Sequence, residues 1–337
     1  MTSSSSLPRG EQLQQWVNEQ TGQVCELKTA SADASFRHYY RVDTNQGSRI
    51  VMDAPPPQED CRPFVHVANL LMATGIHAPD VLAEDIERGF LLLSDLGHET
   101  YLQVLNEDNV ERLYGDALGS LATMQACIDI TSCELPPYDE ALLSRELHLF
   151  SDWYLEQHCQ KKLDDAQVAI LESSFRFLID NALEQPKVCV HRDYHSRNLM
   201  NSATQNPGIL DFQDAVIGPV TYDLVSLLRD CYITWPQAQI EEWVMSYYEL
   251  ATQSGIIDCE HISEAQFIRW FDFMGVQRHL KAIGIFARLL HRDGKPAYVE
   301  DIPRTLNYVL TVCEQYQELE DFLLLLKTLN LADAARV

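Results

Sequence analysis

The chain is poor in positive charge, in long apolar runs and in paired cysteines. It carries 25 Lys and Arg against 50 Asp and Glu, a formal net charge of −25. Nucleic acids and anionic membranes attract Lys and Arg, so neither is expected as a partner. No apolar run of about 18 residues exists to span a bilayer, and the N-terminus (MTSSSSLPRG) lacks the apolar segment of a secretory signal. Nine cysteines without a C-x-x-C pair indicate reduced thiols and predict a cytoplasmic protein.

The most informative segment is residues 191–214, HRDYHSRNLMNSATQNPGILDFQD. Asp193, Asn198 and Asp211 stand five and then thirteen residues apart in it. This spacing is typical of metal-dependent phosphoryl transfer, in which one carboxylate faces the attacking hydroxyl. An amide and a second carboxylate then hold Mg²⁺ against the phosphates of ATP, because Mg²⁺ prefers hard oxygen ligands. The spacing therefore predicts Asp193 as the catalytic residue and Asn198 and Asp211 as metal ligands.

The flanks of this segment support the same interpretation. Residues 187–191 (KVCVH) and 208–212 (GILDF) are short and apolar, which predicts two buried strands around a polar loop. H-R-D-x-x-x-x-N is the kinase catalytic-loop pattern, with His191 expected to brace the loop, and Asp-Phe-Gln replaces Asp-Phe-Gly. The alternative is a zinc site, because His191, Asp193 and His195 alternate. Against it, no further His or Cys follows at ligand spacing.

The remaining residue patterns divide the chain into a sheet-forming part and a helical part. Helical spacing appears at 10–21 and 58–74, strand patterns at 24–29, 36–43, 48–53, 80–85 and 90–94, and long helical patterns at 101–128, 138–183 and from 222 onward. At 337 residues, with 46% hydrophobic content, the chain can form two domains. We therefore expect an α+β protein with an N-terminal lobe (1–97), ending in a hinge at 93–97, and a C-terminal lobe (98–337).

This order resembles the protein-kinase-like fold, in its aminoglycoside-phosphotransferase and choline-kinase branch. Residues 91–97 (LLLSDLG), 209–212 (ILDF) and 218–224 (GPVTYDL) resemble that branch's hinge, metal strand and helix start. Residues 33–41, 52–56 and 277–288 are similar to the bacterial anomeric kinases of N-acetylmuramate and N-acetylglucosamine. The resemblance implies a monomeric enzyme that phosphorylates these amino sugars with ATP and Mg²⁺ in cell-wall recycling. An aminoglycoside or amino-alcohol kinase, and an inactive nucleotide-binding pseudokinase, remain as alternatives.

The resemblance also implies roles for residues outside the catalytic loop. The hinge should offer the Ser94 carbonyl and the Leu96 N–H to adenine. Asp223 should cap the helix that it begins and bond back to the catalytic loop. Arg278 and His279 lie on a helix of the C-terminal lobe, where they should bind the carboxylate or acetamido group of the acceptor. With Lys281, this helix carries three basic candidates within four residues.

Two parts of the kinase pattern are missing. The loop 30–35 (ASADAS) contains no glycine, and Asp53 stands near the position of the usual third-strand Lys. Either Arg37 supplies the positive charge, or the site relies on Mg²⁺ and on backbone N–H groups of the small loop residues up to Ser35. An aspartate cannot pair with phosphates, and this departure keeps the pseudokinase alternative open.

Overall fold

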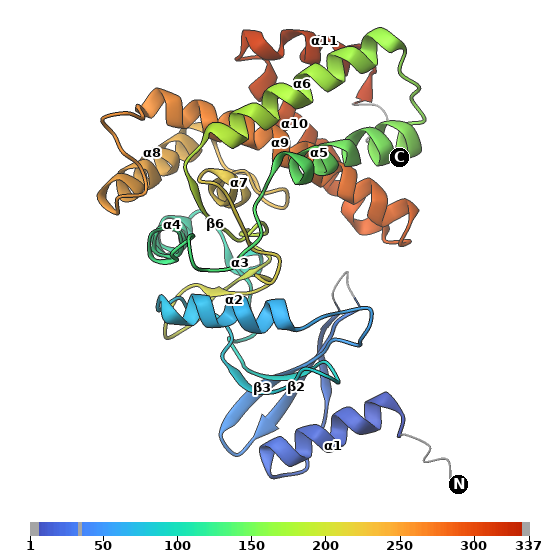
Figure 1. Ribbon diagram of the computed structural model, residues 1–337, viewed down its shortest axis with the longest axis vertical. Coiled ribbons are helices and arrows are strands. Elements are labelled where there is room, and N and C mark those ends of the chain that lie inside the picture. Colours follow the sequence, from blue (N-terminus) through green and yellow to red (C-terminus); the bar gives the residue numbers. More distant parts are fainter. Residues whose placement is uncertain (1–6, 33–35, 332–337) are drawn as a thin grey trace. The chain divides into compact units, whose positions relative to one another are not determined.

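The computed structural model describes residues 7–32 and 36–331, which fold into two compact units (Figure 1). Unit 1 comprises residues 1–100 and 199–214, and unit 2 comprises residues 101–198 and 215–337. Unit 1 contains an antiparallel sheet and unit 2 is mostly helical, which confirms the α+β class. The expected boundary after residue 97 differs from this division, because residues 199–214 belong to unit 1.

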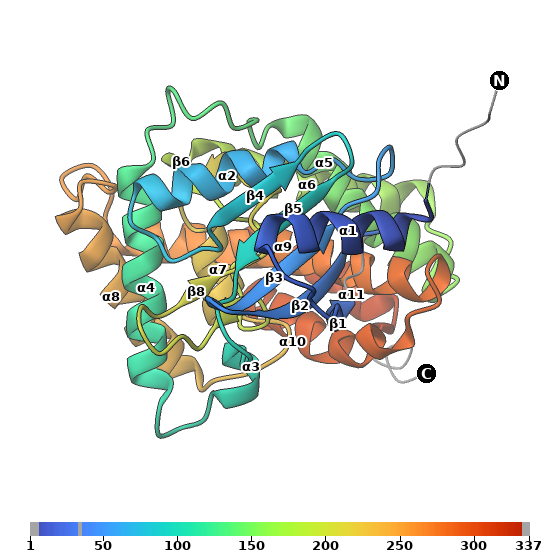
Figure 2. The same ribbon diagram turned by 90° about the horizontal axis from the view of Figure 1, so that it is seen from below.

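Unit 1 is built on a five-stranded antiparallel sheet in the order β1-β2-β3-β5-β4. The strands are β1 (Lys28–Ala32), β2 (His38–Thr44), β3 (Gly47–Asp53), β4 (Val81–Asp85) and β5 (Phe90–Ser94). Helix α1 (Arg9–Thr21) lies across one face (Figure 2), where its Trp16 packs with Val51 and Phe90. Alternation along β3 puts Val51 and Asp53 on that same face, and Met52 on the other.

A short hairpin and a second helix complete unit 1. Strands β7 (Leu199–Met200) and β8 (Gly208–Ile209) pair with each other. Helix α2 (Arg62–Ala73) contacts the residues after β8, with the Phe64 and Phe212 ring centroids 4.7 Å apart. Of the strand expected at 208–212, only Gly208–Ile209 forms a strand. Strand β7 was not predicted from the sequence.

Unit 2 surrounds one long helix, α9 (Glu264–His291), which packs against α5, the π-helix η1, α6, α7 and α10. The other elements are α3 (Tyr101–Val104), α4 (Val110–Cys127), α5 (Glu140–Leu149), η1 (Phe150–His158), α6 (Asp165–Glu184), α7 (Tyr222–Leu228), α8 (Gln237–Gln253), the 3₁₀-helix η2 (Pro296–Asp301), α10 (Ile302–Cys313), the 3₁₀-helix η3 (Gln317–Leu319) and α11 (Glu320–Thr328). No helix in the described ranges is long and apolar enough to cross a bilayer.

The catalytic segment begins at strand β6 (Lys187–Val190), whose partner was not expected. β6 pairs with β9 (Val216–Pro219), which follows the β7–β8 hairpin in the chain. An apolar run identifies a buried strand but carries no information about which strand it pairs with. The prediction of strands on both sides of the loop was right, and the structure shows that these strands have different partners, β9 for β6 and β7 for β8.

Candidate active site

Two carboxylates at the ends of helix α7 fix the backbone of the catalytic loop. Asp223, in the first turn, accepts hydrogen bonds from the N–H groups of His191 (2.6 Å) and Arg192 (2.9 Å). Asp230, just beyond the last turn, accepts from the N–H and the hydroxyl of Ser196, at 2.9 and 2.5 Å. Both carboxylates are almost fully buried. The loop from 191 to 196 is thus held at both of its ends by one short helix.

The role expected of Asp223 is half right. Its side chain bonds back to the catalytic loop as expected, but it does not cap the helix. Thr221 is the N-cap residue of α7, and no side chain makes a capping hydrogen bond there. Burial raises the pKa of Asp223 to about 6, while His191 and the two backbone N–H groups act in the opposite direction.

Glu146 on α5 connects the catalytic loop to helix α9. Its carboxylate pairs with the Arg192 guanidinium and, at 3.1 Å, with Lys281 Nζ, and it accepts the Tyr138 hydroxyl. Arg192 has a φ of +78°, a conformation that a non-glycine residue rarely adopts. Such backbone persists only where its surroundings hold it, and here Asp223 holds the N–H and Glu146 the side chain.

The Asp193 side chain stands at the centre of this unit's polar cluster. Its backbone is fixed, since its N–H donates to His191 Nδ1 at 3.2 Å and its carbonyl accepts from Asn198 Nδ2 at 3.0 Å. No donor among the described residues contacts its carboxylate. Burial raises the pKa of Asp193, but nearby positive charge, including that of Lys281 and Arg278, outweighs burial and lowers it overall. The carboxylate is therefore ionised, and it extends from a fixed backbone without an internal hydrogen-bond partner.

The two expected metal ligands have donor atoms that suit Mg²⁺. Asn198 immediately precedes β7, and its Nδ2 donates to Asp193, so Oδ1 is the atom that could ligate a cation. Asp211 follows β8 in unit 1 with a φ of +63°, and its Oδ1 accepts from Gln213 Nε2 at 2.8 Å. An amide oxygen and a carboxylate match the hard ligands of Mg²⁺. Within the described ranges, no three His, Cys, Asp or Glu side chains form a metal-binding cluster.

Helix α9 presents Arg278 and Lys281 near Asp193 but buries His279 elsewhere. The only acceptor near the Arg278 guanidinium among the described residues is Cys231 Sγ, at 3.7 Å, and its Nε has none. His279 bonds the Arg229 carbonyl at 2.8 Å and stacks on Tyr308 at a centroid distance of 5.0 Å. Burial lowers the pKa of His279 to about 3. Because the neutral ring is both hydrogen-bonded and stacked, His279 has a packing role and is not available to bind the acceptor.

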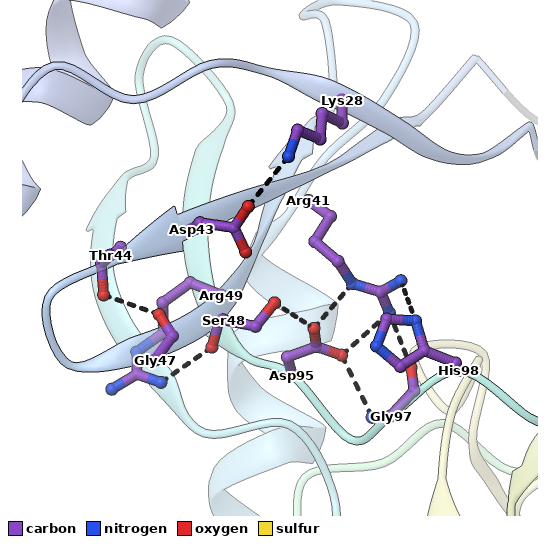
Figure 3. Close-up of polar contacts among 10 residues, drawn as sticks. All are labelled: Lys28, Arg41, Asp43, Thr44, Gly47, Ser48, Arg49, Asp95, Gly97 and His98. Atoms are coloured by element: carbon purple, nitrogen blue, oxygen red, sulfur yellow. Dashed lines mark hydrogen bonds and ion pairs between the residues drawn. The ribbon is translucent and has the colours of Figure 1, made fainter.

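The hinge contains a polar network around Asp95, which Figure 3 shows. Asp95 accepts both forks of the Arg41 guanidinium (2.7 and 3.0 Å), the Ser48 hydroxyl (2.5 Å) and the Gly97 N–H (3.1 Å). Ser94 is tied to Asp80, since its N–H donates to the Asp80 carbonyl and its hydroxyl accepts the Asp80 N–H. The Leu96 N–H has no acceptor within the described part of the chain.

Arg37 and Asp53, the two residues considered in connection with the missing lysine, each pair with a charged side chain in unit 1. Ser35 lies outside the described residues. Arg37 donates from Nε to Glu59 at 3.0 Å, and both side chains are only 12% exposed, so it is not a solvated surface arginine. Asp53 faces α1, where Arg9 Nε donates to it at 2.9 Å. Asp53 therefore does not lie on the face of the sheet opposite α1, and its charge is already neutralised.

Comparison with known proteins decides the family. Residues 26–255 match the phosphotransferase enzyme family. The chain belongs to this family. A relative from Pseudomonas aeruginosa, "N-acetylmuramate/N-acetylglucosamine kinase", is 50% identical over 91% of this chain and 90% of its own length. Relatives with the same name from Pseudomonas putida (48% identity, 93% of this chain and 94% of theirs) and Neisseria meningitidis (41%, 87% of each) agree.

Solved structures of other phosphotransferases share the fold at much lower identity. An ADP-bound aminoglycoside phosphotransferase superposes with a TM-score of 0.57 at 16% identity, covering 88% of this chain and 97% of that one. Choline kinase LicA from Streptococcus pneumoniae gives a TM-score of 0.59 at 13% identity, covering 89% and 99%. At such identities the likeness establishes the fold alone.

Several residues that organise this phosphotransferase were not found from sequence. Glu146 and Asp230 look like ordinary helix and loop acids, and nothing in their spacing marks them as buried partners of the catalytic loop. Arg41 and Asp95 lie more than fifty residues apart. One signal was available for Asp95, because Asp followed two residues later by Gly is a common turn pattern in which the side chain accepts the second N–H.

Proposed function

We propose that this phosphotransferase transfers the γ-phosphoryl group of ATP to the anomeric hydroxyl of N-acetylmuramate and N-acetylglucosamine. The observation that carries the proposal is the Asp193 carboxylate, which is ionised, extends from a fixed backbone and is contacted by no donor among the described residues. In that state it can accept a hydrogen bond from a sugar hydroxyl and orient it for attack. The relatives of the same name supply the class of acceptor.

Asp193 works here chiefly by position. Its low pKa makes it a weak base, so it takes the proton late, when the bond to phosphorus has largely formed. Proton transfer and orientation of this kind contribute about 10²–10⁴-fold to rate. Asn198 and Asp211 would hold Mg²⁺, whose charge offsets that of the phosphates. The Leu96 N–H would bind the adenine ring, with the Ser94 carbonyl beside it.

Arg278 is the residue we assign to the acceptor's carboxylate. It is buried, positively charged and without a carboxylate partner within 4 Å among the described residues, so an anionic group can pair with it. N-acetylmuramate has a lactyl carboxylate, and N-acetylglucosamine has none. Arg278, Lys281 and Arg192 near Asp193 disfavour a polycationic aminoglycoside as the acceptor. His279 has no part in this assignment.

A panel assay tests the proposal. Purified protein is incubated with ATP, Mg²⁺ and one of N-acetylmuramate, N-acetylglucosamine, kanamycin, choline or homoserine, and ADP release is measured. We expect turnover with the two amino sugars only, and a phosphorus-coupled anomeric proton in the product's NMR spectrum. Asp193→Asn should lower turnover by about 10²-fold or more with nucleotide affinity unchanged. Phosphorylation of kanamycin would contradict the acceptor class, and ATP binding without any turnover would indicate a pseudokinase.

A second experiment tests Arg278. We expect Arg278→Ala to raise KM for N-acetylmuramate by about tenfold more than for N-acetylglucosamine, since one charge-assisted hydrogen bond contributes about 1.5–3 kcal/mol. Arg292, the exposed residue that follows α9, gives a matched control. Arg292→Ala also removes one positive charge, but at a position that is not near Asp193. Equal effects of Arg278→Ala on both sugars would remove the carboxylate-binding role.

A further inference from the structure

The hinge network of unit 1 reaches across the sheet to one short peptide. Arg41 lies on β2, where it pairs with Ile50 of β3, and Ile50 pairs in turn with Leu93 of β5. The side chains of Arg41 and Asp95, which lies just after β5, therefore meet across the intervening strand β3 (Figure 3). The guanidinium also donates to the Gly97 carbonyl, so Arg41 links β2 directly to the hinge segment.

The network fixes the peptide groups on both sides of Leu96. The Gly97 N–H donates to Asp95 at 3.1 Å, and the Gly97 carbonyl accepts from Arg41 at 2.6 Å. Gly97 has a φ of +116°, a conformation that favours glycine. On the other side, both the backbone and the hydroxyl of Ser94 are bonded to Asp80. The peptide N–H of Leu96 lies between these fixed points without an acceptor among the described residues.

The network requires Asp95 to be ionised, because every described partner of its carboxylate is a hydrogen-bond donor. Its side chain is only 6% exposed, and burial raises the pKa of Asp95. Hydrogen bonds from Arg41, Ser48 and Gly97 more than compensate, so the pKa is lowered overall. The Arg41 fork is bidentate, the geometry in which a guanidinium both pairs with a carboxylate and fixes its orientation. Replacing Asp95 by a neutral side chain would leave the half-buried Arg41 without its partner.

We propose that Arg41, Ser48 and Asp95 are positioning residues that hold the Leu96 N–H toward the nucleobase and thereby make the enzyme prefer adenine to guanine. Adenine offers the N1 acceptor beside its amino donor, whereas guanine places an N1–H donor beside its carbonyl oxygen. A fixed peptide donor matches the adenine edge and meets the guanine N1–H unfavourably. A mobile peptide would discriminate less, because it could turn to suit either base. This inference rests on the proposed binding of ATP at the hinge.

The test measures nucleobase preference directly. We compare the Kd values for ATP and GTP by calorimetry for the wild type, Asp95→Asn and Ser48→Ala. We expect Asp95→Asn to weaken ATP binding by up to about tenfold, the most that loss of one neutral hydrogen bond from the Leu96 N–H to adenine would cost, and to weaken GTP binding much less. Ser48→Ala removes a single donor from Asp95, so a fall in the ATP preference of about threefold is expected. It serves as the decisive variant if Asp95→Asn does not fold.

The Lys28–Asp43 ion pair on the same sheet, also drawn in Figure 3, provides a matched control for Asp95→Asn. Its side chains are 55% and 73% exposed and do not touch the hinge. Asp43→Asn removes the same charge as Asp95→Asn, and we expect it to leave both Kd values unchanged. An ATP-to-GTP ratio that is unchanged in both hinge variants, with wild-type melting temperatures, would overturn the inference. Sugar turnover by the wild type, measured in parallel, tests the proposed reaction separately.

Discussion

Gly284 in the middle of α9 marks a contact that no side chain can enter. A Cβ built on Gly284 would lie 2.3 Å from the carbonyl carbon of Leu149 and 2.4 Å from its oxygen. Leu149 is the last residue of α5, where the π-helix η1 begins. The clashing atoms are backbone, so they cannot rotate away as a side-chain end would. Gly284→Ala must therefore push α9 and α5 apart.

The expected cost can be bounded from opposing effects. Overpacking a close contact costs about 1–3 kcal/mol, and occasionally more. An overlap with backbone on both sides belongs at the upper end of that range. Alanine is favoured over glycine in a helix interior by about 1 kcal/mol, which offsets part of the cost. We therefore expect Gly284→Ala to lower the free energy of unfolding by about 2 kcal/mol.

Gly115 in α4 provides the control for the same substitution. It lies in the same unit and inside a helix, and its added Cβ would meet nothing within 4 Å. Gly115→Ala should gain up to about 1 kcal/mol from helix propensity alone. Urea denaturation followed by circular dichroism measures both variants against the wild type. If both substitutions changed the free energy of unfolding in the same direction, that result would refute the argument. Helix propensity alone predicts that both variants are stabilised, whereas the backbone clash predicts that only Gly284→Ala is destabilised.

Three further outcomes are expected. Leu96→Pro deletes the backbone donor of the hinge and should weaken ATP binding by about tenfold or more in calorimetry; unchanged affinity in a folded variant would place the base elsewhere. Asp211→Ala should abolish ADP release, and full activity of the wild type in excess EDTA would exclude the metal mechanism. His279 is buried with its pKa lowered to about 3 from 6.5, so the unfolded chain binds its proton first. Its contribution to stability is complete above pH 6.5 and is lost as the pH falls, at about 1.4 kcal/mol per pH unit. His279→Gln keeps a donor for the Arg229 carbonyl and should remove that slope from unfolding titrations; a slope equal to the wild type's would assign it to another group.

Local patterns in the sequence were sufficient for most elements of the fold. The strands of the five-stranded sheet appear within about four residues of their expected ranges, because half-buried strands alternate and their turns carry Gly, Asn and Pro. Asp193, Asn198 and Asp211 could be singled out because phosphoryl transfer requires particular atoms at a particular spacing. Partners of strands were not predictable in this way, as β6 and β9 illustrate.

The sequence alone determined the fold class, the family resemblance and the catalytic loop, since each depends on residues close together in the chain. Only the tertiary structure could bring Glu146 to Arg192, Asp230 to Ser196 and Arg41 to Asp95. It also showed His279 stacked on Tyr308, where the resemblance had implied binding of the acceptor, and Asp53 paired with Arg9. The reason is physical: burying a charge is costly unless a partner compensates it, and which partner is within reach depends on how helices and strands pack, which local spacing does not encode.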